Sequence, residues 1–194
     1  FVSAPSANTS GRPSPTLAEH VAEDLGGKID MILDGGAVEI GLESTILDMT
    51  VTPPMILRPG AITAEMFEEV IGKVDVDETL LVAESEKAPK APGMKYRHYA
   101  PKAKLMIVEG DLREEIFAIR QLAYKAYKEG RKVGVIATTE TLPFYKYGVV
   151  KNIGTRENEK TIARNLYRVL REFDEEDVEE IYSESFAAQG IGKA

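Results

Sequence analysis

The sequence contains no cysteine and only two histidines among its 194 residues. Without cysteine, disulfide bonds and thiolate metal sites are excluded. No run of about 18 or more apolar residues occurs, which argues against a transmembrane helix, and no stretch has the pattern of a secretory signal peptide. These absences predict a cytoplasmic protein without a membrane partner.

Common catalytic signatures are also lacking. The sequence has no Walker loop, no nucleophile elbow and no His/Cys cluster at metal-ligand spacing. Gly190-Ile191-Gly192 is not a dinucleotide fingerprint, because the third glycine is missing. The chain opens on Phe1 within an apparent strand and closes on a glycine-rich turn. We therefore expect a fragment of a longer protein.

The net charge of −8 is unevenly distributed along the chain. Residues 1–92 carry 6 basic and 16 acidic side chains, residues 93–104 carry 4 basic and no acidic ones, and residues 105–194 carry 14 and 16. A chain this acidic is a poor candidate for binding a nucleic-acid duplex over a broad face. The basic island at 93–104 is suited to local contacts with phosphates.

Apolar residues make up 43% of the chain, enough for a packed core. Beyond residue 103 the pattern alternates strand and helix, which predicts a small α/β domain with a mostly parallel sheet. The predicted strands are 29–33, 44–48, 55–58, 105–108, 132–137 and 178–182, and the predicted helices begin after Thr16, at Ala64, near Leu112 and at Thr161. Thr16 and Glu19 form a candidate capping box, and His20 falls near the polar face of that first helix.

The opening loop is the first candidate site. Ser3, Ser6, Asn8 and Ser14 lie between bends fixed by glycine and proline, and the loop leads into a helix N-terminus. Hydroxyls, an amide and free N–H groups at such a place favour a phosphate or carboxylate. The same residues also fit an ordinary turn with a helix cap, and composition alone favours the turn.

Three further positions are candidates. Ser44 sits at the head of a strand and can bind a substrate or pair across strands. Arg58 ends a strand, where its guanidinium can hold a phosphate or carboxylate, or pair with a nearby acid. Arg97, His98 and Tyr99 suit a lid that stacks on a base and meets phosphates, or a plain interdomain linker.

Taken in order, these segments resemble the threonylcarbamoyl-AMP synthases in their two-domain form, a YrdC-like catalytic domain followed by a small Rossmann-like domain. The resemblance rests on motifs in residues 1–102, while the α/β pattern of 103–194 fits the second domain. The motifs are Ser3–Asn8, Ser10–Thr16, Leu33–Gly36, Glu43–Ile46, Leu57–Ile62 and Pro92–Pro101.

The resemblance implies the C-terminal portion of a YrdC-like α/β domain at 1–73, a linker at 74–102 and a Rossmann-like α/β domain at 103–194. It implies synthesis of threonylcarbamoyl-adenylate and pyrophosphate from L-threonine, bicarbonate and ATP with Mg²⁺, for other proteins to transfer to tRNA. By the same resemblance, Ala4 and Ser44 bind threonine, and ATP is bound by Ser6, Asn8, Ser14, Arg58, Arg97, His98 and Tyr99. Positioning and charge neutralisation, without a covalent nucleophile, suffice for such chemistry.

The sequence departs from the family in one large respect: the first half of the catalytic domain, with its Lys and Arg cluster, is not in this chain. We therefore expect little or no synthase activity from these residues alone. A non-catalytic module that binds RNA or a nucleotide is an alternative, with weak tRNA binding at the basic island. A carbamoyl-transfer relative that uses carbamoyl phosphate is a third hypothesis, against which the second domain argues.

Overall fold

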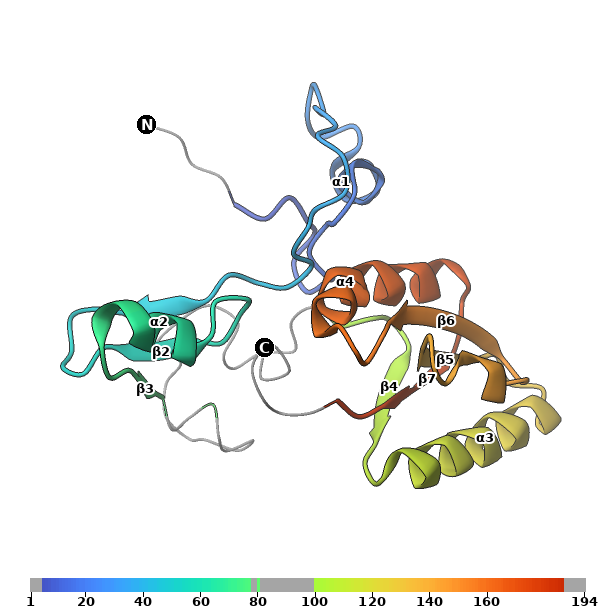
Figure 1. Ribbon diagram of the computed structural model, residues 1–194. Coiled ribbons are helices and arrows are strands. Elements are labelled where there is room, and N and C mark those ends of the chain that lie inside the picture. The colour runs from blue at the N-terminus through green and yellow to red at the C-terminus, as the bar shows by residue number, and fades with distance from the viewer. Residues whose placement is uncertain (1–4, 78–79, 81–99, 187–194) are drawn as a thin grey trace. The chain divides into compact units, whose positions relative to one another are not determined.

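The structure is a computed structural model that describes residues 5–77, 80 and 100–186 (Figure 1). By packing, the chain divides into two compact units: Phe1–Gly41 with Tyr99–Phe186, and Leu42–His98 with Ala187–Ala194. We call these the first and the second unit. The predicted domain boundaries at 73 and 102 were drawn from the sequence pattern and not from packing. They remain a prediction.

The first unit is built on a parallel sheet in the order β4-β7-β5-β6. Its strands are β4 (Lys104–Val108), β5 (Val133–Thr138), β6 (Val149–Gly154) and β7 (Glu180–Glu184), with the 3-10 helix η2 (Leu142–Phe144) between β5 and β6. All of β5 is buried, as expected for a strand covered on both faces. The predicted α/β class with a mostly parallel sheet is confirmed.

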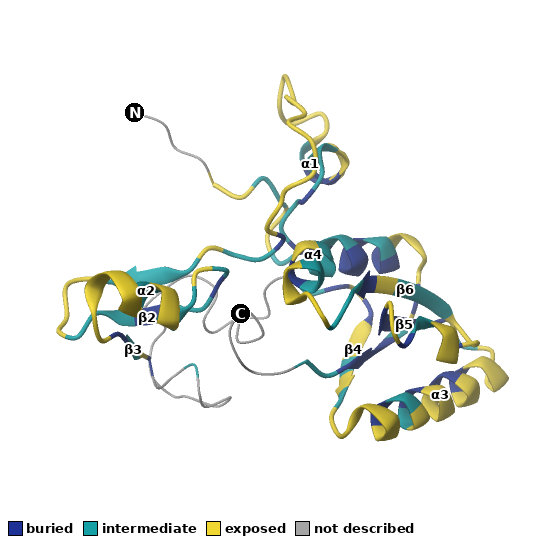
Figure 2. Ribbon diagram, in the orientation of Figure 1, coloured by how far each residue is buried: buried dark blue, intermediate teal, exposed yellow. Residues whose placement is uncertain are grey.

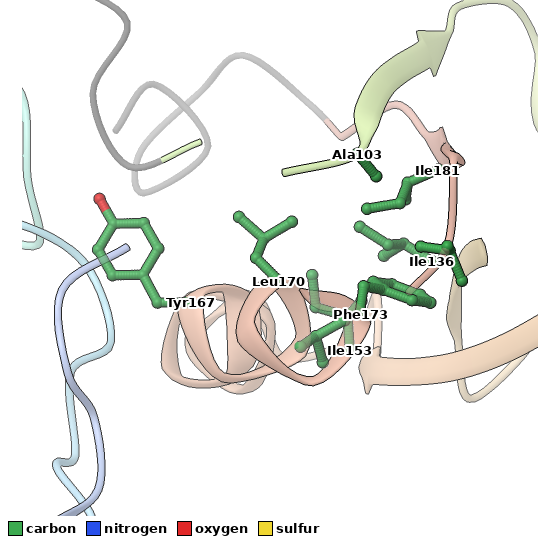
Figure 3. Packing of buried hydrophobic residues seen from close by; sticks show 9 residues of the cluster. Ala103, Ile136, Ile153, Tyr167, Leu170, Phe173 and Ile181 are labelled. Carbon is green, nitrogen blue, oxygen red and sulfur yellow. The ribbon is translucent and has the colours of Figure 1, made fainter. Parts of the chain in front are cut away.

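Two long helices cover opposite faces of this sheet, α3 (Leu112–Lys128) and α4 (Glu159–Glu175) (Figure 1). Because side chains alternate along a strand, Val135 faces α3 while Ile136 faces α4. Figure 3 shows Leu170 and Phe173 of α4 packed toward Ile136 and Ile181. Phe173 is fully buried, and truncating such a residue to alanine costs about 3–5 kcal/mol.

The second unit is smaller. Strand β1 (Ile46–Asp48) pairs antiparallel with β2 (Met55–Arg58), and β2 pairs parallel with β3 (Asp75–Val76). Helix α2 (Ala64–Ile71) connects β2 to β3 and begins as predicted, with the Thr63 hydroxyl accepting a hydrogen bond from the Met66 amide. Figure 2 shows α2 largely exposed, so the core of this unit is confined to the sheet side.

Two local predictions are wrong. Residues 29–33 form no strand and are exposed. Helix α1 (Ala18–Leu25) has Leu17 at its N-cap position, without a side-chain cap. The amide of Thr16 donates instead to Nδ1 of His20 at 3.1 Å, so His20, and not Glu19, reaches back to Thr16. His20, which the sequence places near the polar face of the helix, is buried.

Candidate functional site

Ser44 and Arg58 are brought together in the second unit. The Nη2 atom of Arg58 donates to the Ser44 hydroxyl at 3.1 Å, and its Nε donates to the Ser44 carbonyl at 3.0 Å. The Glu43 carboxylate lies 3.9 Å from Nη2. One edge of the guanidinium therefore holds both the backbone and the side chain of Ser44. The ion pair with a nearby acid, left open by the sequence, is present beside that contact.

The backbone around Ser44 is built for this contact. Gly60 follows β2 closely, and a Cβ atom at Gly60 would lie 2.4 Å from the Glu43 carbonyl oxygen and 2.5 Å from the Thr45 amide nitrogen. Thr45 adds two hydrogen bonds, since its hydroxyl donates to the Ile62 carbonyl at 2.7 Å and accepts from the Ile62 amide at 3.2 Å. A glycine at position 60 is thus what allows the two segments to touch.

Asn8 lies in the first unit, in a tight turn. Its Nδ2 donates to the carbonyls of Thr9 at 3.0 Å and Arg12 at 3.2 Å, and the Arg12 amide donates to the Thr9 carbonyl at 3.1 Å. Gly11, with φ of 89°, supplies the left-handed residue of the turn. Within the described part of the chain, Oδ1 of Asn8 is buried and accepts no hydrogen bond.

Of the remaining predicted site residues, the structure describes only two. Ser6 is exposed and Ser14 half-buried, both in the first unit. Ala4, Arg97, His98 and Tyr99 lie outside the described residues. The structure thus joins Ser44 to Arg58 and orders the turn at Asn8, while the other assignments rest on the resemblance.

Arg171 and Asp24 form a buried ion pair that the sequence analysis missed. Nη2 of Arg171 lies 2.8 Å from Oδ2 of Asp24, and neither side chain is exposed. Asp24 also accepts from the Thr9 amide at 3.0 Å and from the Arg12 guanidinium. Burial alone would raise the pKa of Asp24, but the hydrogen bonds from Arg171 and Thr9 and the charges of Arg171 and Arg12 hold it below its usual value.

A sequence signal for Arg171 did exist. Tyr167, Arg171 and Asp174 recur at helical spacing, and in the structure all three lie buried on α4. The partner itself was not visible, because Asp24 lies 147 residues away in the sequence.

A second polar cluster lies where strands of the first unit end. The Glu184 carboxylate is fully buried and accepts from the Tyr145 hydroxyl and from Nη2 of Arg156, each at 2.7 Å. Arg156 also lies 3.6 Å from the buried Glu115. Burial, and then the bond to Glu184, raises the pKa of Tyr145. One guanidinium thus faces two buried carboxylates, and removing Arg156 would leave Glu184 buried without its counter-charge, which is strongly destabilising.

A metal centre built by side chains does not fit the described residues, among which no three His, Cys, Asp or Glu side chains cluster to hold an ion. No helix among these residues is long and apolar enough to cross a membrane.

The fold and these contacts define an α/β protein that carries a hydrogen-bonded Ser44–Arg58 pair in its second unit and a polar turn at Asn8 in its first. A family model described as "Threonylcarbamoyl-AMP synthase, C-terminal domain" matches residues 62–194, and one described as "Telomere recombination" matches residues 1–60. The chain belongs to the threonylcarbamoyl-AMP synthase family.

Two relatives match this chain over its full length, and a solved structure matches nearly all of it. Threonylcarbamoyl-AMP synthase of Bacillus subtilis is 47% identical over 193 residues, covering 100% of this chain and 54% of the relative. The Pyrococcus abyssi protein of that name is 45% identical, covering 100% and 55%. A crystal structure of P. abyssi Sua5 complexed with L-threonine matches with a TM-score of 0.85 and 43% identity, covering 97% of this chain and 53% of that one. The chain thus spans about half the length of these relatives.

Proposed function

We propose that this chain contributes to a threonylcarbamoyl-AMP synthase, which joins L-threonine, bicarbonate and ATP to give threonylcarbamoyl-AMP, pyrophosphate and water. The observation that carries the proposal is the match of fold and sequence to the P. abyssi protein, whose crystal structure is described as a complex with L-threonine. The identity of 43% extends over nearly the whole chain.

The contact between Ser44 and Arg58 supports the proposal, because it joins residues that we assign to two different substrates. Ser44 is the residue that we assign to threonine, and Arg58 is assigned to ATP. Because Arg58 holds Ser44 by two hydrogen bonds, the two substrates would be oriented by one hydrogen-bonded pair of residues. Holding reactants in a fixed orientation is a large part of catalysis when no covalent nucleophile is used.

Charge neutralisation is the second element. Transfer of the adenylyl group releases pyrophosphate, and negative charge develops on the leaving phosphates. A guanidinium meets phosphate oxygens with two parallel hydrogen bonds. We assign Arg58 this role, with Ser6, Asn8 and Ser14 along the nucleotide and Arg97, His98 and Tyr99 over it. Ala4 is assigned to threonine together with Ser44.

Mg²⁺ enters the proposal as the counter-ion of ATP, whose phosphates supply oxygen ligands of the kind that this cation prefers. The product would pass to tRNA-modifying proteins, and the compartment we propose is the cytoplasm.

The test is an omission experiment on the complete protein. Pyrophosphate release is measured with threonine, bicarbonate, ATP and Mg²⁺ together and with each left out in turn. We expect release when all are present and loss when threonine or bicarbonate is absent. Release that continues without threonine would refute the proposal. Salt-dependent tRNA binding without turnover would favour the non-catalytic alternative.

A further inference from the structure

The side chain of Arg171 on helix α4 contacts the opening loop. Arg171 is fully buried, and its guanidinium donates to the Pro13 carbonyl from Nε at 3.0 Å and from Nη2 at 2.6 Å. It also contacts Asp24 at 2.8 and 3.3 Å and Glu23 at 3.4 Å. All five N–H donors of this guanidinium therefore have acceptors.

The loop is fixed at three points by this arrangement. The Thr9 amide donates to Asp24, the Arg12 guanidinium pairs with Asp24 and Glu23, and the Pro13 carbonyl accepts from Arg171. Asp24 carries two of these contacts, and Asp24 is itself held by Arg171. Removing the guanidinium would release the Pro13 contact directly and leave a buried carboxylate short of donors.

The two sides of this contact come from different parts of the sequence. Residues 9–24 fall within the segment matched by one family model, and Arg171 falls within the segment matched by the C-terminal-domain model. Both belong to the first unit. The C-terminal part of the chain thus contacts directly the loop between Asn8 and Ser14, both of which we assign to ATP.

We propose that Arg171 is a positioning residue that fixes the loop Thr9–Pro13 and so couples helix α4 to nucleotide binding. The coupling to the nucleotide rests on the function proposed above, while the fixing of the loop does not. By linkage, a residue that pre-orders a binding loop strengthens the binding of its ligand, and the ligand in turn strengthens the order of the loop.

The experiment uses the complete protein and three variants, Arg171→Met, Arg171→Lys and Arg168→Met. Arg168 is the matched control, because it lies on α4 but bonds to Asn165 and Glu172 of its own helix. Hydrogen exchange is measured at the hydrogen-bonded amides of Thr9 and Arg12 and at those of β5 and β7, without ligand. Calorimetry then gives the dissociation constant for ATP with Mg²⁺.

In Arg171→Met, we expect the amides of Thr9 and Arg12 to exchange roughly tenfold to a hundredfold faster, the range set by losing a hydrogen bond to a charged group, while β5 and β7 stay protected. The dissociation constant for ATP should rise roughly fivefold to a hundredfold. Arg171→Lys should fall between, since lysine keeps the charge but not the fork. Arg168→Met should leave both quantities unchanged.

A purely structural role predicts something else: exchange that rises equally in β5, β7 and the loop, with ATP affinity unchanged in the folded fraction. That result would overturn the proposal. If Arg171→Met does not fold, the lysine variant decides by the same two readouts. If the unaltered protein binds no ATP, the proposed function and the coupling both fail, whereas the exchange data still decide whether Arg171 fixes the loop.

Discussion

Arg58 holds Ser44 at two points, the hydroxyl at 3.1 Å from Nη2 and the carbonyl at 3.0 Å from Nε. A fork of this kind fixes both the rotamer and the backbone of the serine. The placement of the residue assigned to threonine therefore depends on the residue assigned to ATP. Substitutions at either position should affect both substrates.

Substituting Arg58 by lysine tests this dependence. Lysine is a point charge without the planar fork, so we expect kcat/KM to fall roughly tenfold to a hundredfold, the range for losing a hydrogen bond to a charged group. The KM values for threonine and for ATP should both rise in steady-state assays of pyrophosphate release by the complete protein. Arg113→Lys, at an exposed position of α3, is the control. An unchanged KM for threonine would show that Arg58 does not place Ser44.

Gly60→Ala should disturb the same corner through the backbone. The added methyl group would meet the Glu43 carbonyl at 2.4 Å, and such overpacking costs about 1–3 kcal/mol. We expect faster hydrogen exchange in β2 and a higher KM for threonine. Gly35→Ala is the matched control, because a Cβ atom there meets nothing within 4 Å. Equal behaviour of the two variants would contradict the close approach.

Titration of His20 should make the free energy of unfolding depend on pH. Burial, aided by the nearby Arg171 guanidinium, lowers the pKa of His20. The unfolded chain therefore takes up a proton near its ordinary value of about 6.5 before the folded chain does. The free energy of unfolding should fall as the pH drops below that value. His20→Gln, whose amide oxygen can still accept from Thr16, should lose less stability over this interval. If the free energy of unfolding changes with pH in the same way in His20→Gln and in the unaltered protein, His20 is not the titrating group.

Titration of Glu140 should change the free energy of unfolding at lower pH. The hydrogen bond from the Thr155 hydroxyl, with others including that of the Arg156 amide, lowers the pKa of Glu140 to about 2. Its contribution is present above the unfolded value and is lost as the pH falls from about 4.5 toward 2. Because Glu140 is exposed, we expect no more than about 1 kcal/mol. Glu140→Gln should flatten acid unfolding over that interval, and a slope equal to that of the unaltered protein would contradict this.

Much of the first unit could be predicted from the sequence, because its signals are local. Apolar spacing marked α3 and α4, and short apolar runs marked β4, β5 and β7. Strand β6 was missed, since it lies at the edge of the sheet, where Lys151 and Asn152 break its apolar run. Residues 29–33 resemble a strand in composition, but they pair with no strand among the described residues.

The contacts at the candidate site were harder to predict from the sequence, because they join residues far apart in it. Helical periodicity put His20 on a polar face, yet the amide of Thr16 and the nearby Arg171 form its surroundings. Ser44 and Arg58 were each predicted as ligands of a substrate, but not as partners of one another. Pairing across 14 residues depends on the turn between β1 and β2 and on the glycine at position 60.

We propose that these residues serve the joining of threonine, bicarbonate and ATP. Incubating the complete protein with isotope-labelled bicarbonate, threonine and MgATP, and identifying the adenylate by mass spectrometry, tests it most directly. We expect threonylcarbamoyl-AMP that carries the label, at a yield reduced in Arg58→Lys. An unlabelled adenylate, or a labelled product that forms without threonine, would contradict it.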